Sequence, residues 1–571
     1  MSLLSGLLIL AWASAAAQTD TTGHRHHEPG TKFRELPPPP MMQGIGDASL
    51  KITTASEQAQ SYFDQGLKLL HCFWDFEAYR AFKEAARLDP SAAMAYWGEF
   101  EALGVGRSDT MKEEKKAALD KAKSLAAQAS EHEQFYIRAA EHQDKPDDSK
   151  ERAAYQREME ALIDRYPDDL NAQTFLALGV MGGYETDGRP REGELYAQAV
   201  LRNVLAGHPD NAAANHYWIH AVEASSRPEA ALKSAEALGR LAPNSGHMVH
   251  MPGHIYWRVG DYARARQSFI EAMRVDEAYM ANQQIRPEED WNYAHNLTYL
   301  IAACAEGGRY QEGLKWAQKL RGMPAPMGMT SARFVTWAGA SVVRLRIRFG
   351  DWQAVGGGAI EFGTDRASVG PAAKAYVEGI GFYAKGMAAD ERGDPAEASK
   401  QAEALDALLW RLSASKPKEK DKDKEPKPDE EDPSQVLNIL GTMSLDLRGN
   451  TKSVQGEWEE AFKLIQQSIE KEKDLGYSEP PQYYRPGLES LGSACLRAHQ
   501  WEKARDAFTQ ALSRRPKSGH ALYGIARSYA LAGDVPKAVQ AYKDFLAEWQ
   551  DADNELPQIK QAKAWLTVHG Q

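Results

Sequence analysis

The sequence predicts an all-α fold, an α-solenoid in which antiparallel helix pairs stack into a superhelix. Groups of glycine, alanine and phenylalanine recur along the 571 residues at the spacing of a helix pair. No alternating polar and apolar run of useful length competes with this pattern. A chain of this length is too long for one compact core. A repeat array avoids this limit, because each unit packs only on its neighbours.

The repeats begin near Ala59. Small residues let two helices approach, Phe82 fills the seam between them, and Pro90 ends the second helix. The skeleton of this first repeat is Gly66, Ala78, Phe82, Ala85 and Pro90. It recurs at Gly253, Ala265, Phe269 and Ala272, at Gly492, Ala504, Phe508, Ala511 and Pro516, and 34 residues later at Ala526, Ala538 and Tyr542. Weaker copies occupy 308–320, 350–355 and 386–405. The spacing is that of a tetratricopeptide repeat, which predicts a tetratricopeptide-repeat solenoid.

The N-terminal residues 1–17 are predicted to be a secretory signal peptide. An apolar run from Leu3 to Ala13 is followed by three alanines, 15–17, which provide a small-residue cleavage site before Gln18. We therefore expect a periplasmic or secreted protein. No later stretch has the length and apolarity of a membrane span.

The mature chain divides by composition into four segments. Residues 18–50 contain the histidine tract 24–27 and the prolines 37–40, and predict an extended arm. Residues 51–413 form an N-terminal repeat array. Residues 414–434 are rich in charge and proline, which predicts a flexible linker. Residues 435–571 form a C-terminal array.

Charge and cysteine content exclude some classes of protein. The net charge of −12 argues against a nucleic-acid binder, whose binding surface would be basic. Three cysteines, an odd number, argue against a disulfide framework. Cys304 and Cys495 fall at helix-packing positions and are predicted to be buried and inert. The roles of Cys72, of the adjacent His71 and of the histidine tract stay open.

Two histidine pairs are the main indication of function. His216 and His220 lie 34 residues before His250 and His254, so equivalent positions of two consecutive repeats carry histidine. All four fall on the first helix of their repeats. Side chains four residues apart share a helix face, and packed helices lie roughly 8–10 Å apart, so these imidazoles can reach one point.

Further ligand-type residues lie nearby. Glu223 shares the face of His220, His247 precedes the second pair by one turn, and His295 opens the next first helix. Imidazole and carboxylate ligands suit zinc, copper, iron or nickel. The metal site predicted from these residues comprises His216, His220, Glu223, His250, His254, His295 and His247. Pro252 either starts the second helix, which would place His250 before it, or kinks it.

The chain resembles a group of exported bacterial tetratricopeptide-repeat proteins. The resemblance rests on the HxxxHxxE motif at 216–223, the HMxHMPxHI motif at 247–255 and the phrase AMAYWG at 93–98. It covers about residues 59–545 and implies repeats whose first helices line a concave groove. It implies no activity, and where the pattern implies a further histidine this chain has Thr298.

Three functions are compatible with these observations. The first is an exported scaffold that holds a transition metal, such as zinc, copper or iron, on its concave face and binds a protein or peptide partner there. The second is a metal-dependent enzyme, hydrolytic or oxidative, that uses the same residues. The third is a metal-free interaction scaffold whose histidines contact a peptide. The sequence contains no phosphate-binding loop, dinucleotide fingerprint or serine nucleophile motif.

Overall fold

The structure, a computed structural model, describes residues 36–570 except 105–108, 144–147, 327–333, 335–339, 357–369, 415–432, 482 and 484. The expected signal peptide, most of the expected arm and nearly all of the charged linker therefore lie outside the described residues.

The described chain is all-helical, which confirms the predicted fold class. Its only β-type pairing is an isolated bridge between Tyr184 and Pro190. Successive helices pack as pairs. The helices of the first part are α1 Glu57–His71, α2 Asp75–Leu88, α3 Ala93–Ala102, α4 Asp109–Leu125, α5 Glu131–Glu141, α6 Ser149–Arg165, α7 Leu170–Val180, α8 Glu194–Gly207, α9 Ala212–Glu223, α10 Leu232–Leu241, α11 Gly246–Arg258 and α12 Tyr262–Gln283. The 3-10 turns are η1 Ala126–Gln128, η2 Pro228–Ala231 and η3 Pro287–Glu289.

The second part continues the same arrangement. Its helices are α13 Trp291–Glu306, α14 Tyr310–Arg321, α16 Ser341–Phe349, α17 Trp352–Gly356, α18 Pro371–Glu391, α19 Pro395–Ala414, α20 Ser434–Val454, α21 Trp458–Lys473, α22 Gly487–Arg497, α23 Trp501–Arg514, α24 Gly519–Leu531, α25 Val535–Glu548 and α26 Pro557–His569. Helices α18, α19 and α20 pack together, so the stack continues across the residues of the charged linker.

Aromatic residues fill the seams between helices, as predicted. Phe82 of α2 lies against Gly66 of α1, where an added Cβ would come within 2.6 Å of its ring. Phe269 of α12 holds the same place against Gly253 of α11. The arrangement recurs a third time between Phe508 and the pair Gly492 and Gly524. The small residues are therefore required because the helices approach too closely for a side chain.

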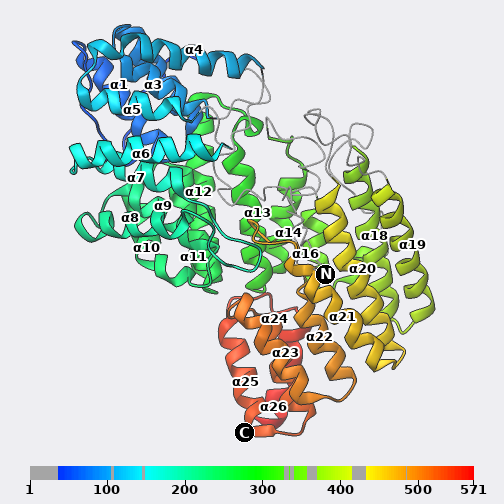
Figure 1. The fold of residues 1–571 in the computed structure, drawn as a ribbon. Helices are drawn as coiled ribbons and strands as arrows, with labels where there is room; N and C mark the ends of the chain where they lie inside the picture. Colours follow the sequence, from blue (N-terminus) through cyan, green and yellow to red (C-terminus); the bar gives the residue numbers. More distant parts are fainter. Residues whose placement is uncertain are drawn as a thin grey trace, which may run out of the picture.

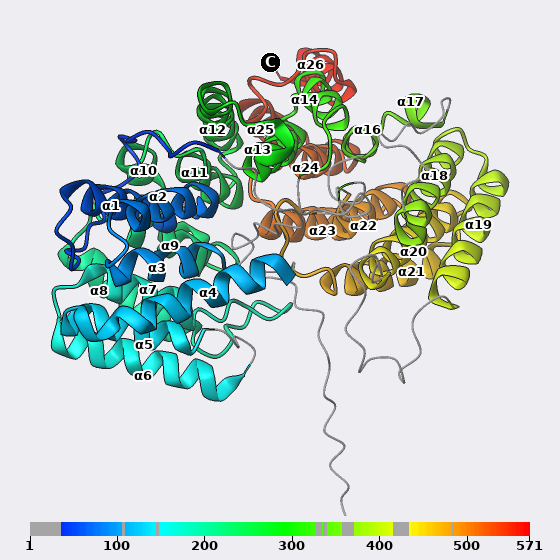
Figure 2. The ribbon, with the colours of Figure 1, turned by 90° about the horizontal axis from the view of Figure 1, so that it is seen from above.

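The stack curves so that its C-terminal helices return to its middle (Figure 1). Figure 2 shows α24, α25 and α26 beside α13 and α14. The indole of Trp549 donates a hydrogen bond to the carbonyl of Glu306 at 2.8 Å, and the Asp553 amide donates to the Gly308 carbonyl at 3.0 Å. One apolar core consequently joins α9–α16 to α24–α26.

A buried ion network strengthens this return contact. The guanidinium of Arg348 on α16 binds both carboxylate oxygens of Glu306, at 3.0 and 2.8 Å, and also binds Glu489. Arg515 and Ser518 contribute further hydrogen bonds to Glu306, at 2.9 and 2.6 Å. Glu306 and Arg348 belong to the predicted N-terminal array, and Glu489, Arg515 and Ser518 belong to the C-terminal one, so this buried network joins the two predicted arrays.

Two further features bear on the sequence predictions. Residues 36–50, the described part of the expected arm, contain no helix and lie on the solenoid, where Ile45 and Leu50 are buried. Within the described residues, no helix combines the length and apolarity that crossing a membrane requires.

Candidate metal centre

Three helices carry the histidines, and each begins at a side-chain cap. Asn211 accepts from the Ala214 amide at 2.7 Å and starts α9, and Asp290 accepts from the Asn292 amide at 3.1 Å and starts α13. Ser245 caps α11 in the same way. Such caps satisfy backbone N–H groups that have no partner inside the helix. The predicted placement of both histidine pairs on successive first helices is confirmed.

Helix α11 runs through Pro252 from Gly246 to Arg258. The alternative in which the helix starts at the proline is therefore wrong. Proline removes one intrahelical hydrogen bond, and inside a helix it usually costs about 3 kcal/mol or more. His250 and His254 nevertheless keep their one-turn spacing, and their Nε2 atoms lie 2.5 Å apart.

The first triad consists of His216, His220 and His247. The Nε2 atom of His216 lies 3.0 Å from the Nε2 atom of His220 and 3.0 Å from that of His247. One nitrogen from each ring lies within 4.8 Å of the other two. Helix α9 supplies two of these residues and α11 supplies the third.

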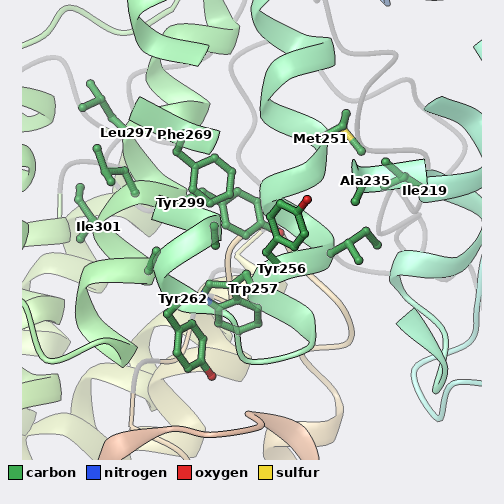
Figure 3. Close-up of a cluster of buried hydrophobic side chains, with 14 of the residues drawn as sticks. Ile219, Ala235, Met251, Tyr256, Trp257, Tyr262, Phe269, Leu297, Tyr299 and Ile301 are labelled. Atoms are coloured by element: carbon green, nitrogen blue, oxygen red, sulfur yellow. The ribbon is translucent and has the colours of Figure 1, made fainter. Parts of the chain in front are cut away.

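The second triad consists of His250, His254 and His295, and its ligand atoms meet the same 4.8 Å spacing. Helix α11 supplies two residues and α13 the third. Apolar rings surround it: Tyr299 lies 4.3 Å from His254 between ring centroids, and Phe269 lies 5.2 Å from His250. Figure 3 shows Phe269 and Tyr299 stacked among the side chains of this core.

The six histidines thus gather in two triads and do not meet at the one point expected for the two pairs. Each triad takes a pair from one helix and completes it with His247 or His295. Ring centroids of His247 and His250 lie 5.7 Å apart, so the two triads are neighbours. At most 8 % of any of these side chains or of Glu223 is exposed.

Glu223 stands between the triads. Its Oε1 atom lies 2.9 Å from His220 Nδ1, and its Oε2 atom lies 2.6 Å from His254 Nδ1. Burial raises the pKa of the Glu223 carboxyl, but His254 and His220 outweigh that effect and hold the pKa well below its ordinary value. The carboxylate is therefore ionised and accepts from both imidazoles.

Two segments distant in the sequence cover the cluster. Phe73, in the turn between α1 and α2, stacks on His220 at 5.4 Å and contacts His216 edge-on at 4.6 Å. Tyr477, which follows α21, donates to Glu223 Oε2 at 3.3 Å. Glu479 lies 3.7 Å from His254 Nδ1, and burial and the Glu223 carboxylate raise the pKa of Glu479 to about 8.

Sequence reasoning missed Phe73, Tyr477 and Glu479. Tyr477 and Glu479 lie more than 250 residues from Glu223 along the chain. Glu223, His254 and Glu479 form a further set of ligand-type atoms within 4.8 Å of one another. No spacing or repeat register links these positions, so only the folded chain reveals them.

A small pocket opens beside His247. Its walls combine the aromatic residues Phe73, Trp74, Phe76, Tyr279 and Trp291 with the acidic residues Asp276, Glu289 and Asp290. Burial raises the pKa of Asp290 to about 6. The first triad therefore borders on an opening with acidic walls.

His71 and Cys72, to which the sequence assigned no role, are buried and have contacts within the fold. The backbone carbonyl of His71 accepts from His216 Nδ1 at 2.7 Å, and the His71 ring stacks on Phe175. Burial lowers the pKa of the His71 imidazole to about 4. Cys72, Cys304 and Cys495 are buried free thiols, and burial raises the pKa of each.

Comparison with known proteins agrees with the helical geometry. Residues 490–553 match the tetratricopeptide-repeat family. These residues form tetratricopeptide repeats. The described helices as a whole form an α-solenoid. No curated protein matches the chain in sequence.

Solved structures with similar helix stacks are distant. The chain is 13% identical to a chain in the crystal structure of the APC/C hetero-tetramer Cut9-Hcn1, covering 88% of this chain and 76% of that one at a TM-score of 0.29. It is 12% identical to human IFIT1, in a dimer with m7Gppp-AAAA, covering 81% and 90% at a TM-score of 0.34. It is 13% identical to yeast Tom70, covering 90% and 95% at 0.29. Similarities this low carry no functional inference.

Proposed function

We propose that this tetratricopeptide-repeat scaffold binds a transition metal in its buried histidine cluster. The main support for the proposal is that the unprotonated Nε2 atoms of two histidines face each other. His216 donates through Nδ1 to a carbonyl, and His220 donates through Nδ1 to Glu223, so in the neutral rings both Nε2 atoms bear lone pairs. These two lone pairs face each other at 3.0 Å.

Two lone pairs at that distance repel unless a positive species lies between them. A proton would create an imidazolium, and a buried charge is costly without full compensation. A metal ion instead uses both lone pairs, and the Nδ1 acceptors then act as the outer partners that fix ring orientation in metal sites. His254 repeats the pattern, since its Nδ1 faces Glu223 and its Nε2 faces His250.

The ligand chemistry limits the choice of metal. Neutral imidazole suits zinc, copper, iron and nickel, whereas magnesium and calcium prefer oxygen ligands. Burial also argues against the metal-free alternative in which these histidines bind a peptide, because a peptide could reach them only if the covering segments moved away.

The test is metal content combined with thermal stability. The chain purified without chelator should contain zinc, copper or iron by elemental analysis. After chelation, adding back the metal should raise the unfolding temperature, because a ligand that binds only the native state stabilises it. The variant carrying His220→Ala and His254→Ala should lose both effects.

The matched control replaces His208 and His569, which are exposed, with alanine. It should bind and respond as the unmodified chain does. A chelated chain that takes up none of zinc, copper, iron or nickel, with no change in unfolding temperature, would overturn the proposal.

The pocket beside His247 favours a second candidate, a metal-dependent enzyme. Metals with an open position activate bound water or polarise a substrate, and the pocket borders the first triad. Cobalt-loaded protein should then change its visible spectrum when azide is added. A spectrum insensitive to azide would favour a closed site without turnover.

Export is proposed on the N-terminal sequence alone. Protein recovered from the periplasm or culture medium should begin at Gln18 by mass spectrometry of its N-terminal peptide. Recovery only from the cytoplasm with residues 1–17 retained would contradict this proposal.

A further inference from the structure

We infer that the histidine cluster holds two metal ions, one in each triad. This inference rests on the proposed function and adds the number of ions and their separate ligand sets. The first triad, His216, His220 and His247, would bind one ion, and the second triad, His250, His254 and His295, would bind the other.

The spacing of the ligand atoms excludes one ion shared by six imidazoles. Nitrogens bound to a single ion at about 2.1 Å lie within about 4.2 Å of one another. Within the described chain, the sets whose ligand atoms all lie within 4.8 Å of one another contain three members each. No such set combines histidines of both triads. One ion can therefore engage one triad at a time in this arrangement.

Helix α11 explains how two sites arise side by side. Helix α11 contributes His247 to the first triad. It contributes His250 and His254, which lie on the next turns, to the second triad. The ring centroids of His247 and His250 lie 5.7 Å apart. This distance is close to the rise of one helical turn. Each site is thus built across an interface between first helices: α9 with α11, and α11 with α13.

Three imidazoles are a sufficient set for each ion. Three protein ligands with a fourth position left for water or another ligand is a common zinc arrangement, and imidazole suits copper equally well. The two sites differ in surroundings, since the first borders the acidic pocket and the second lies among Phe269 and Tyr299. The ion in the first triad should consequently exchange faster.

A carboxylate lies between the two proposed sites. Positive charge in a buried region needs a negative partner. Glu223 contacts one imidazole of each triad, at 2.9 and 2.6 Å, so its negative charge serves both sites. Glu479 adds a second carboxyl 3.7 Å from His254 Nδ1.

The experiment counts zinc ions per chain. The background carries His24→Ala, His26→Ala and His27→Ala, so that the N-terminal tract cannot contribute. Zinc titration and elemental analysis after gel filtration should give two ions for this background. Adding His247→Ala should leave one ion, adding His295→Ala should leave one ion, and adding both should leave none. His208→Ala, at an exposed position, should leave two.

The outcomes separate the inference from the proposed function. No zinc in the background protein would overturn both. One ion in the background, removed by either substitution, would mean a single shared site and would overturn the inference alone. One ion that is insensitive to His247→Ala and His295→Ala but removed by Glu479→Gln would assign it to the set of Glu223, His254 and Glu479, again overturning the inference. If circular dichroism shows that a variant is unfolded, the count in the background protein decides.

The rates at which a chelator removes the two ions provide a second test. In the two-ion protein, a chelator in excess should remove one ion faster than the other, and His247→Ala should eliminate the fast phase. A single phase in the two-ion protein would contradict the assignment of the accessible ion to the first triad.

Discussion

At the scale of single residues, the acceptor on the Nδ1 side decides what each imidazole can do. A carbonyl or carboxylate on that side holds the proton at Nδ1 and leaves the lone pair at Nε2. His216 has the His71 carbonyl there, and His220 and His254 share Glu223. Glu223 therefore acts as a positioning residue for the triads.

We expect Glu223→Gln to weaken metal binding without changing the number of ions. A carboxamide has one acceptor oxygen, so only one of His220 and His254 keeps its acceptor, and the other ring is free to protonate Nε2. Loss of such a partner typically weakens affinity about 10- to 100-fold. Competition with a chelator of known affinity measures the change. Glu229→Gln, at an exposed position, is the control, and equal affinity of the two variants would contradict the role assigned to Glu223.

Single residues also show where prediction from sequence stops. The repeat register predicts the helices that carry His216, His220, His250 and His254, because a 34-residue period fixes helix and face. It does not predict that each pair is completed by one histidine of the next first helix. Tyr477 and Glu479 could not be found, because their contact with the cluster depends on the return of the chain.

At the scale of elements, the glycine and phenylalanine of each repeat set the distance between helices and hence the position of the ligands. Gly253 lies one residue before His254, and Phe269 of α12 fills the space that a Cβ would need. Phe269 also contacts His250 at 5.2 Å between ring centroids. The seam that defines the repeat thus also supports the second triad.

Gly253→Ala should therefore destabilise the protein and weaken the second triad. The new Cβ would lie 2.6 Å from the Phe269 ring, so α11 and α12 must move apart. Overpacking of this kind typically costs about 1–3 kcal/mol. Thermal unfolding and zinc counting measure the two effects.

The matched control is Gly239→Ala in α10, where nothing lies within 4 Å of an added Cβ. There alanine should stabilise the helix by about 0.5–1 kcal/mol. Equal unfolding temperatures for the two variants would show that the seam is loose enough to accept a methyl group.

At the scale of the whole molecule, the return of α22–α26 to α13–α16 unites the stack. The repeat pattern predicts neighbouring contacts only, since each unit repeats the same local packing. Curvature accumulates over many repeats, and no local pattern in the sequence specifies which helices the returning C-terminal repeats contact. Glu306, Arg348 and Arg515 carry no sequence signal that distinguishes them from surface charges, yet they form a buried network.

Through this closure, metal binding at the proposed sites should affect the C-terminal half. Tyr477 and Glu479 contact Glu223 and His254, so ordering of the cluster should also order the segment after α21. We expect zinc to slow amide hydrogen exchange in peptides covering 474–479, measured by mass spectrometry. Tyr477→Phe should reduce this protection while leaving that of α9 in place. Protection confined to α9, α11 and α13 in the unmodified protein would refute the coupling.

The contact between α24 and α13 should respond to acid through His520 on α24. Its Nε2 donates to the Ala305 carbonyl at 3.0 Å, and burial, with Arg348 nearby, lowers the pKa of this imidazole to about 4. In the unfolded chain the imidazole titrates near about 6.5. Below that pH the unfolded state takes up a proton that the folded state resists, so stability falls as the pH drops from about 6.5 towards 4. By this linkage, His520 should account for a loss of about 2 kcal/mol between pH 7 and pH 5.

Glutamine can keep the hydrogen bond to Ala305 but cannot gain charge, so His520→Gln should unfold in urea with a smaller dependence on pH. The comparison is made in chelator, so that metal release does not contribute, with the exposed His569→Gln as control. If His520→Gln and His569→Gln lose the same stability on acidification, protonation of His520 does not weaken the contact between α24 and α13.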